Sequence, residues 1–280
     1  MPYDTVDYGV ADGVATLTLN RPERLNALSG DVLHVLNTSM DAAESDDAVR
    51  VIVLAGAGRA FCSGFDLKDE VDAGVIAPAD WQALLTTGFE TIMRFWRSPK
   101  PTIAAVHGFA IAGGCELALA CDITIAAQGT LLGEPELRFG SGLVALLLPW
   151  LTGPKQAKEM LFTGNDRITA EHAQAIGLIN RVVPSGEHLA AAQAIAREIA
   201  LVDQVSLRLT KRAVNRTYDI MGMASALQMG LDTHVIIESI ETPLRRAFMA
   251  IARKDGLKAA IAWRDARFAG RRDEAFEPEE

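Results

Sequence analysis

Cysteine is scarce in this 280-residue sequence, which contains only three of them. Cys62, Cys115 and Cys121 are an odd number, show no CxxC spacing and have too few neighbouring histidines for a zinc site. The sequence therefore predicts neither a disulfide framework nor a metal centre. Such cysteine usage is typical of a reducing compartment.

Excess basic charge, long apolar runs and nucleotide motifs are also missing. The net charge is −9, and the 27 Lys and Arg residues are dispersed, which argues against a nucleic-acid surface. The longest apolar run, Leu143–Leu151, covers nine residues and is too short to span a bilayer. Met1–Asp7 is acidic and lacks the order of a signal peptide. No GxxxxGK[ST] or GxGxxG motif follows a predicted strand. We expect a cytoplasmic protein that binds neither nucleic acid nor membrane.

What the sequence does contain is enough apolar material for a full core, at 49% hydrophobic residues. Its segments alternate between strand and helix patterns, and after Pro154 the helical patterns dominate. Strands are predicted at 14–19, 49–56, 101–108, from 123, and at 178–183, and helices from 29, over 81–96, from 113, and over 155–162, 169–175, 186–201 and from 205. Strand, helix, strand predicts parallel, right-handed crossovers. We expect an α/β core over residues 1–200 and a helical region over 201–280.

Two carboxylates, Glu116 and Glu136, stand out because each follows a turn-forming stretch beside an apolar segment. A carboxylate at the rim of a core is costly unless it is paired or used, and two of them suit a reaction that adds and removes protons. Gly113-Gly114 stands at a predicted helix start, where free N–H groups favour negative charge. A second glycine turn at 61–67 follows a strand, so two donors are available for an oxyanion hole.

Structural interpretations of the same residues remain open at this point. A Gly-Gly pair also serves tight turns, Glu116 is equally consistent with a paired structural carboxylate, and Glu136 with an exposed acid after a turn. Cys62 and Cys115 have no histidine placed to activate them and are predicted to be packing residues. We expect the remaining polar candidates, His107, Asp66 and Asp122, to be structural.

The motifs resemble those of the crotonase family, the enoyl-CoA hydratases and isomerases. The resemblance covers most of the chain in the family's order. It is carried by residues 17–23, Asn26-Ala27-Leu28, 59–67, 103–117 with Cys121-Asp122, 161–164, 168–170 and 175–184.

This resemblance implies an α/β fold, a crotonase (ClpP-like) spiral of ββα units followed by a helical C-terminal region for trimerisation. It implies a homotrimer or a dimer of trimers that acts on an acyl-CoA thioester, with no cofactor apart from the coenzyme A of the substrate. By motif position, the N–H groups of Phe65 and Gly113 would hold the thioester oxygen.

The resemblance also implies a coenzyme site. Ser63, Phe65 and Leu67 would line the adenine pocket. Asp66, in the same stretch, is either a coenzyme ligand or a structural carboxylate. Lys68 lies where the family often places a basic residue near the phosphates, and a solvated surface lysine is an equal alternative.

Both carboxylates together are the mark of the family's hydratases, in which Glu116 would deprotonate water for attack at C3 and Glu136 would exchange the proton at C2. We therefore predict an enoyl-CoA hydratase that forms 3-hydroxyacyl-CoA. An isomerase, a hydrolase and a non-catalytic acyl-CoA-binding member remain the alternatives.

The sequence departs from the family pattern after Glu136. Residues 141–150 are shorter and more apolar than the usual Gly- and Pro-rich loop, so Gly142 is predicted to replace that loop's N–H donor to water. Val144 stands near the position of the aspartate of dienoyl isomerases, which argues against that activity. Residues 254–268 resemble the family's final helix. On it, Arg264 and Arg267 are expected on a solvated face, and contact with coenzyme phosphates across a subunit interface is the alternative for both. The acidic end, Glu274–Glu280, is predicted to be disordered.

Overall fold

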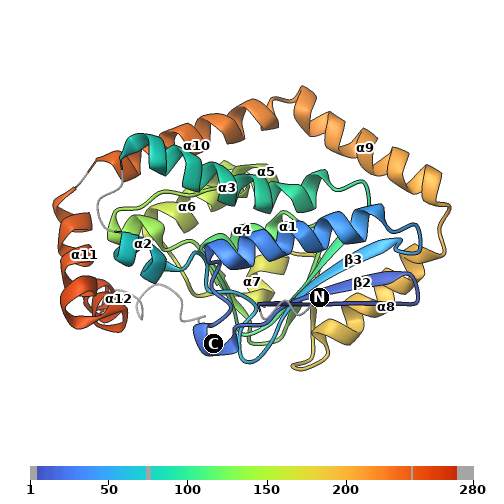
Figure 1. The fold of residues 1–280 in the computed structure, drawn as a ribbon, viewed down its shortest axis with the longest axis horizontal. Coiled ribbons are helices and arrows are strands. Elements are labelled where there is room, and N and C mark those ends of the chain that lie inside the picture. The colour runs from blue at the N-terminus through green and yellow to red at the C-terminus, as the bar shows by residue number, and fades with distance from the viewer. Residues whose placement is uncertain (1–4, 74–76, 241, 270–280) are drawn as a thin grey trace, which may run out of the picture.

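The computed structural model describes residues 5–73, 77–240 and 242–269 (Figure 1). Its larger sheet has the strand order β1-β2-β3-β4-β6-β9, in which β1 and β2 are antiparallel and the other neighbours are parallel. The strands are β1 Val6–Ala11, β2 Val14–Leu19, β3 Val51–Gly56, β4 Thr102–Val106, β6 Ile123–Ala127 and β9 Arg181–Val183.

The apolar run of β3 reflects burial of the sheet on both faces. Side chains alternate along a strand, so Val51 and Val53 face one side and Ile52 and Leu54 the other, and all four are fully buried. The first pair packs against α8 (His188–Ala200), which presents its alanines closely to the sheet. The second pair belongs to the main core beneath the helices of the opposite face.

A smaller sheet continues the chain path at the carboxyl ends of the first. It contains β5 (Phe109–Ile111), β7 (Leu131–Gly133) and β8 (Ile168–Thr169) in the order β5-β7-β8. Isolated bridges join Cys62 to Ala110 and Leu28 to Phe65, which ties the turn after β3 to this layer. The repeated passage from large sheet to small sheet to helix is the predicted spiral.

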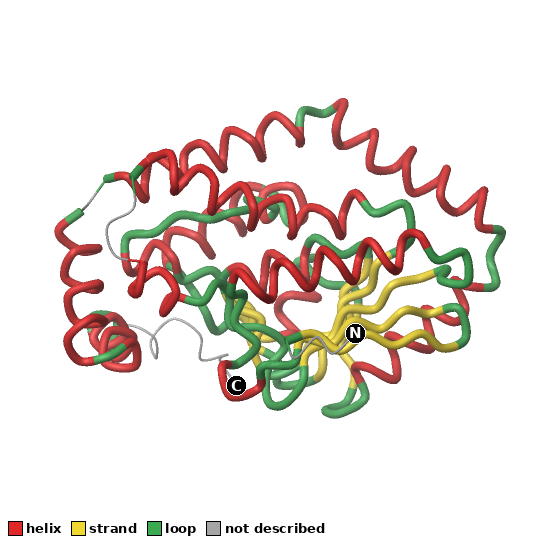
Figure 2. Tube along the Cα trace, in the orientation of Figure 1, coloured by secondary structure: helices red, strands yellow, loops and turns green. Residues whose placement is uncertain are grey.

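Helices cover both faces of the large sheet, with the strands gathered at one end of the molecule (Figures 1 and 2). Short 3-10 turns occupy Pro22–Arg24 (η1) and Glu136–Phe139 (η2). The helices before α8 are α1 Gly30–Ser45, α2 Leu67–Ala73, α3 Pro78–Arg97, α4 Gly113–Leu119, α5 Leu148–Leu151, α6 Pro154–Thr163 and α7 Ala170–Ala175.

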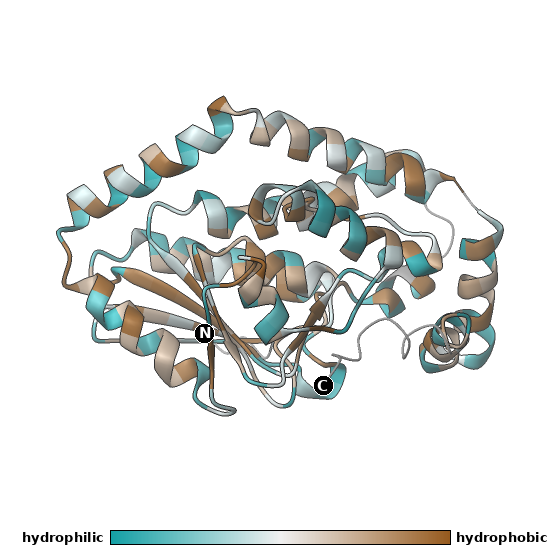
Figure 3. Ribbon diagram, turned by 180° about the vertical axis from the view of Figure 1, so that it is seen from behind, coloured by the Kyte–Doolittle hydropathy of each residue, from teal (hydrophilic) through white to brown (hydrophobic). Residues whose placement is uncertain are grey.

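After α8 the described residues form only helices. They are α9 Gln204–Ile220, α10 Met223–Ser239, α11 Pro243–Asp255 and α12 Leu257–Ala266. The first two arch along the outside of the molecule, mixing apolar and polar residues, whereas the strands, which lie below them in these views, are mainly apolar (Figures 1 and 3). No single helix in the described ranges is long and apolar enough to cross a membrane. Only α9 and α10 together pass that test, and they are bent by 62° at their junction.

The predicted elements are confirmed with small differences. Ser29 caps α1 by accepting a hydrogen bond from the N–H of Val32, as its residue type suggests. The strand predicted at 178–183 is shorter, because β9 begins only at Arg181. The prediction for Glu274–Glu280 lies outside the described residues.

Candidate active site

The two predicted donor turns lie directly against each other. Gly64 has φ +93°, and a Cβ at this position would lie 2.6 Å from the Cβ of Ala112 and 3.2 Å from the N atom of Gly113. A Cβ on Gly114 would lie 2.4 Å from the carbonyl oxygen of Cys62. Both glycines are therefore required for the close approach of the 61–67 turn to the start of α4.

The N–H groups of Phe65 and Gly113 remain available at this junction. The bridge to Leu28 uses the carbonyl of Gly64 and the N–H of Asp66, so the N–H of Phe65 is not part of it. Gly113 is the first residue of α4, where N–H groups have no acceptor within the helix. No hydrogen bond between described residues uses either group.

A strained residue precedes the second donor. Ala112, the N-cap of α4, has φ +57° and ψ −136°, a conformation that L-residues rarely adopt. Its N–H donates to the carbonyl of Gly133 at 2.8 Å, which connects the start of α4 to the end of β7. Strain of this kind persists where the surroundings hold it, and it is common at functional sites.

The same connection brings the two predicted acids into one cavity. Glu116 lies in the first turn of α4, and Glu136 opens η2, three residues after β7 ends at Gly133. Their residues are 2% and 7% exposed, which rules out the exposed-acid interpretation of Glu136. Both line a cavity of about 500 Å³. Both oxygens of Glu116 and Oε2 of Glu136 have no hydrogen-bond partner in the described chain.

Burial is the main influence on the acidity of these groups. It raises the pKa of Glu116 well above its usual value, and the nearby charge of Glu136 raises it further. Burial likewise raises the pKa of Glu136 to about 8, although its own backbone N–H and the charge of Arg264 act in the opposite direction. A proton is therefore retained in the cluster near neutral pH, which suits a site that must both give and take one.

A third buried carboxyl, Glu134, was missed by the sequence reasoning. It is 1% exposed, and burial raises its pKa, with further increases from the charges of Glu136 and Glu116. Its side chain contacts those of Cys115 and Glu136. The alternation Glu134-Pro135-Glu136 was visible in the sequence, but only the turn of the chain into η2 shows that both acids are buried.

The replacement Glu134→Gln is expected to make stability less sensitive to pH. A carboxyl with a raised folded-state pKa stabilises the fold fully below its unfolded pKa, near 4.5, and that contribution is lost as pH rises through the folded pKa. Removing it should raise the free energy of unfolding relative to the wild type by about 1–3 kcal/mol at pH 8, and by less at pH 5. Thermal unfolding at both pH values measures this. Exposed Glu159→Gln is the control, and an equal effect of the two variants would contradict the prediction.

The predicted coenzyme residues lie at the other side of the same cavity. Ser63, Phe65, Asp66 and Leu67 line it, whereas Lys68 is exposed and does not. The carboxylate of Asp66 forms ion pairs with two arginines, Arg21 at 3.2 Å and Arg24 at 2.9 Å. Its structural interpretation therefore gains support, while a coenzyme contact of its residue stays a prediction.

The unusual 141–150 segment closes the cavity over Glu116. Gly142 and Val144 line the cavity, and Val144 and Ala145 are buried. The backbone N–H groups of Ala145 and Val144 act to lower the pKa of Glu116, without hydrogen-bonding geometry to its oxygens. The N–H groups of Ala145 and Val144, rather than the N–H of Gly142, therefore influence the pKa of Glu116. The prediction for Gly142 as donor to water remains a prediction.

The other polar candidates have structural surroundings. Burial raises the pKa of Cys62 to about 12, which is unfavourable for a nucleophile. His107 contacts the carbonyl of Gly58 at 2.9 Å, and Asp122 pairs with Lys211 at 2.6 Å. Within the described ranges, no group of three or more His, Cys, Asp or Glu residues could hold a metal ion.

The expectation for Arg264 was wrong. Its residue is 7% exposed, and its guanidinium pairs with Asp166 at 3.2 Å, beside the cavity. Arg267 is exposed, as expected, and stacks over the ring of Trp263. Helical spacing alone did not reveal that α12 packs its Arg264 face against the core.

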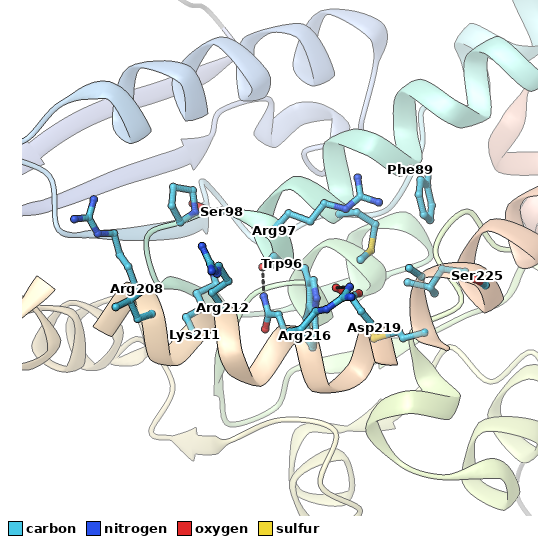
Figure 4. Close-up of a pocket in the computed structure, with 17 residues that line it drawn as sticks. Phe89, Trp96, Arg97, Ser98, Arg208, Lys211, Arg212, Arg216, Asp219 and Ser225 are labelled. Carbon is cyan, nitrogen blue, oxygen red and sulfur yellow. Dashed lines mark hydrogen bonds and ion pairs between the residues drawn. The ribbon is translucent and has the colours of Figure 1, made fainter. Parts of the chain in front are cut away.

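A second, larger cavity lies elsewhere, and none of the predicted site residues lines it. It has about 980 Å³ and lies between α3 and α9, where Asn215 donates to the carbonyl of Trp96 at 2.8 Å (Figure 4). Apolar side chains form part of its wall. Its cationic side chains are Arg97, Arg208, Lys211, Arg212 and Arg216. The buried acids and the donor turns make the smaller cavity the candidate active site.

The comparisons with known proteins identify the family of the chain. The profile of the "Enoyl-CoA hydratase/isomerase" family matches residues 9–243. The chain belongs to this family. A crystal structure of an enoyl-CoA hydratase/isomerase from Xanthobacter autotrophicus Py2 is 51% identical, with a TM-score of 0.93, covering 95% of this chain and 99% of that one.

Curated members of the enoyl-CoA hydratase/isomerase family are similar over much of the chain. A putative enoyl-CoA hydratase of Thermus thermophilus is 41% identical over 201 residues, 71% of this chain and 79% of that protein. A crotonyl-CoA hydratase of Syntrophomonas wolfei is 34% identical over 274 residues, 96% of this chain and 99% of that protein. The crotonase fold expected from the sequence motifs is confirmed.

Proposed function

We propose that the protein is an enoyl-CoA hydratase, which adds water across the 2,3 double bond of a 2-enoyl-CoA to give a 3-hydroxyacyl-CoA. The observation that carries the proposal is the presence of two buried carboxyls with unpaired oxygens, Glu116 and Glu136, in one cavity. Beside them lie the two unused N–H groups of Phe65 and Gly113. The similarity to proteins called enoyl-CoA and crotonyl-CoA hydratases supports it.

In the proposed reaction, the thioester oxygen accepts hydrogen bonds from the N–H groups of Phe65 and Gly113. The step requires the form of the cluster in which the retained proton lies on Glu136. In that form the Glu116 carboxylate takes a proton from water while the water oxygen bonds to C3. The π electrons move onto C2 and the thioester carbonyl as an enolate, whose negative oxygen the two donors stabilise. Glu136 then gives its proton to C2. The raised pKa of Glu136, about 8, keeps that proton available at neutral pH.

The coenzyme would lie along the turn that contains Ser63, Phe65 and Leu67. The chain that leads into this turn is fixed by hydrogen bonds, because the side-chain amide of Asn26 donates to the carbonyls of Ala57 at 2.9 Å and Ala60 at 2.8 Å. A rigid turn holds the N–H of Phe65 in position before the substrate binds, so little conformational entropy is lost on binding. The exposed Lys68 next to it remains available to the phosphates.

The test is incubation with crotonyl-CoA in H₂¹⁸O, followed by mass spectrometry of the product. A hydratase gives 3-hydroxybutyryl-CoA with one ¹⁸O atom. An isomerase moves the double bond of a 3-enoyl-CoA without label, and a hydrolase places the label in a free acid. If acyl-CoA binds but no enoyl-CoA of any chain length is converted, the protein is a binding member and the proposal fails.

We also propose a homotrimer, alone or as a dimer of trimers. The 17-residue α9 has no buried residue, yet it exposes apolar side chains such as Val205 and Leu209. Such a face on a long helix is typical of a protein interface. The nearby cavity between α3 and α9 includes Leu209 in its wall.

Leu209→Asp is expected to dissociate this assembly, because it places a charge in the apolar interface. Light scattering should give at least three times the 30.1 kDa chain mass for the wild type and a smaller mass for the variant. Val10→Asp, an equally drastic change on the exposed edge strand β1, serves as the control. A monomeric wild type would contradict the proposal.

A further inference from the structure

The phenyl ring of Phe65 packs between the backbones of two helices. A Cβ on Gly88, in the middle of the 20-residue α3, would lie 2.7 Å from Cζ and 2.8 Å from Cε1 of this ring. A Cβ on Gly113, at the start of α4, would lie 2.6 Å from Cε2 and 2.7 Å from Cδ2. One edge of the ring therefore rests on each helix, and both positions require a residue without a Cβ.

Gly88 is the less expected of the two glycines. Glycine is common at helix ends but destabilises a helix when it stands in the interior, as Gly88 does. The space that its missing side chain leaves is occupied by the distal end of the Phe65 ring. Accommodation of the ring therefore gives this glycine a structural reason.

The ring also forms part of the wall of the active-site cavity. Leu85 on α3 and Glu116 on α4 line the cavity, whereas Gly88 and Gly113, each three residues away on the same helix, are buried and do not. Residues three apart share a face of a helix, so the two glycines would face the cavity if nothing covered them. Phe65 is only partly buried and lines the cavity. Its ring therefore separates both glycines from the cavity.

The first carbons of the acyl group would lie against this wall. The ring belongs to one of the proposed oxyanion donors, Phe65, and packs on the other, Gly113. Cγ1 of Val144 lies 3.6 Å from the position of a Cβ on Gly88, and the backbone N–H of Val144 acts on Glu116. In the proposed reaction, C3 must lie between the two donors and Glu116. The ring and Val144 are therefore the apolar groups nearest to C2 and C3.

We propose that the ring of Phe65, held in place by Gly88, determines the acyl specificity of the site and restricts it to 2-enoyl groups that are unbranched at C2 and C3. This inference rests on the proposed hydratase function and specifies its substrate class. Because both edges of the ring meet helix backbone, the ring has little room to yield to a methyl branch. Close-packed walls reject additional atoms for this reason. Gly88 acts through the ring and is a positioning residue.

The experiment compares kcat/KM for crotonyl-CoA with kcat/KM for its 2-methyl and 3-methyl derivatives. Phe65→Ala keeps the backbone N–H but removes the ring, and should raise the ratio of methyl derivative to crotonyl-CoA by about ten-fold or more, the effect of one such group in an apolar pocket. Phe65→Leu should give a smaller increase. The intrinsic reactivity of each compound is the same for every variant, so the change in ratio reports on the pocket. Phe162→Ala, a 73% exposed residue outside the cavity wall, is the control.

Gly88→Ala tests the role of the glycine. Its Cβ would displace the end of the ring, and because Gly113 blocks the opposite edge, the ring must move into the cavity. This variant should lower the ratio of methyl derivative to crotonyl-CoA. In the Phe65→Ala background the same change should leave the ratio unaltered, because the ring through which it acts is gone. An equal effect in both backgrounds would overturn the role of Gly88.

Equal ratios in wild type, Phe65→Ala and Phe65→Leu would overturn the inference, and circular dichroism verifies that each variant folds. Hydration of crotonyl-CoA by the wild type tests the proposed function separately. If no compound is hydrated, calorimetry with butyryl-CoA and 2-methylbutyryl-CoA still decides the role of the ring. The wild type should then bind the branched compound more weakly, and Phe65→Ala should reduce that difference. A difference that stays the same in the variant would contradict the inference.

Discussion

Glu116→Gln is expected to reduce kcat for crotonyl-CoA hydration by about 10²–10⁴, because the amide cannot take the proton of the attacking water. The replacement preserves the shape of a side chain that is 2% exposed, so the fold should be retained. Steady-state kinetics of crotonyl-CoA hydration measures this loss.

Glu136→Gln is expected to reduce kcat for crotonyl-CoA hydration by a similar factor, but by blocking a different step of the reaction. It removes the proton donor to C2, so exchange of the C2 proton of 3-hydroxybutyryl-CoA in D₂O should cease. The double variant should lose little more than either single one, since the two acids act in one reaction. Glu159→Gln, an exposed acid on α6, is the control. Wild-type turnover by both single variants would refute the assignment of these residues.

Gly114→Ala is expected to reduce kcat by about 10²–10³, the effect of losing an oxyanion donor. The added Cβ would lie 2.4 Å from the carbonyl oxygen of Cys62, so the backbone of α4 or of the 61–67 turn must move. Either movement separates the N–H groups of Phe65 and Gly113. Stability should fall by about 1–3 kcal/mol from overpacking.

The control for this change is Gly9→Ala, since a Cβ at Gly9 meets no atom within 4 Å. Urea unfolding and crotonyl-CoA kinetics together separate the loss of stability from the loss of catalysis. An alanine at 114 that leaves kcat unchanged at full stability would contradict the proposed donor geometry.

Much of the fold was predictable because its elements have strong local patterns. The apolar alternation of Val51–Leu54 and the cap at Ser29 depend on neighbours in the chain, and the structure confirms both. β1 was not predicted, since only Val6 of this strand is buried and its pairing with β2 depends on a partner strand. The prediction for Arg264 failed for a similar reason, because the burial of this side chain comes from the packing of α12 against Asp166.

The site was predictable only in part. Glu116 and Glu136 were singled out from local turns in the sequence, and Phe65 and Gly113 from the resemblance of their motifs to those of the family; the roles of all four stay predictions. No local pattern pointed to His234, which is 98 residues from Glu136 and reaches the cavity through the packing of α10 on Gly142. A histidine at helical spacing is most often a core or surface residue, so only its position identifies it.

The sequence by itself determined that two carboxylates, Glu116 and Glu136, follow glycine- and proline-containing turns in a chain of alternating strand and helix patterns. Residue type and chain-local turns are enough for that, because backbone freedom at glycine and apolar periodicity act over a few residues. Tertiary structure alone decided that both acids are buried, that Glu134 joins them and that His234 lines the same cavity. Burial and raised pKa values depend on every chain segment around a group, and those segments come from distant parts of the sequence.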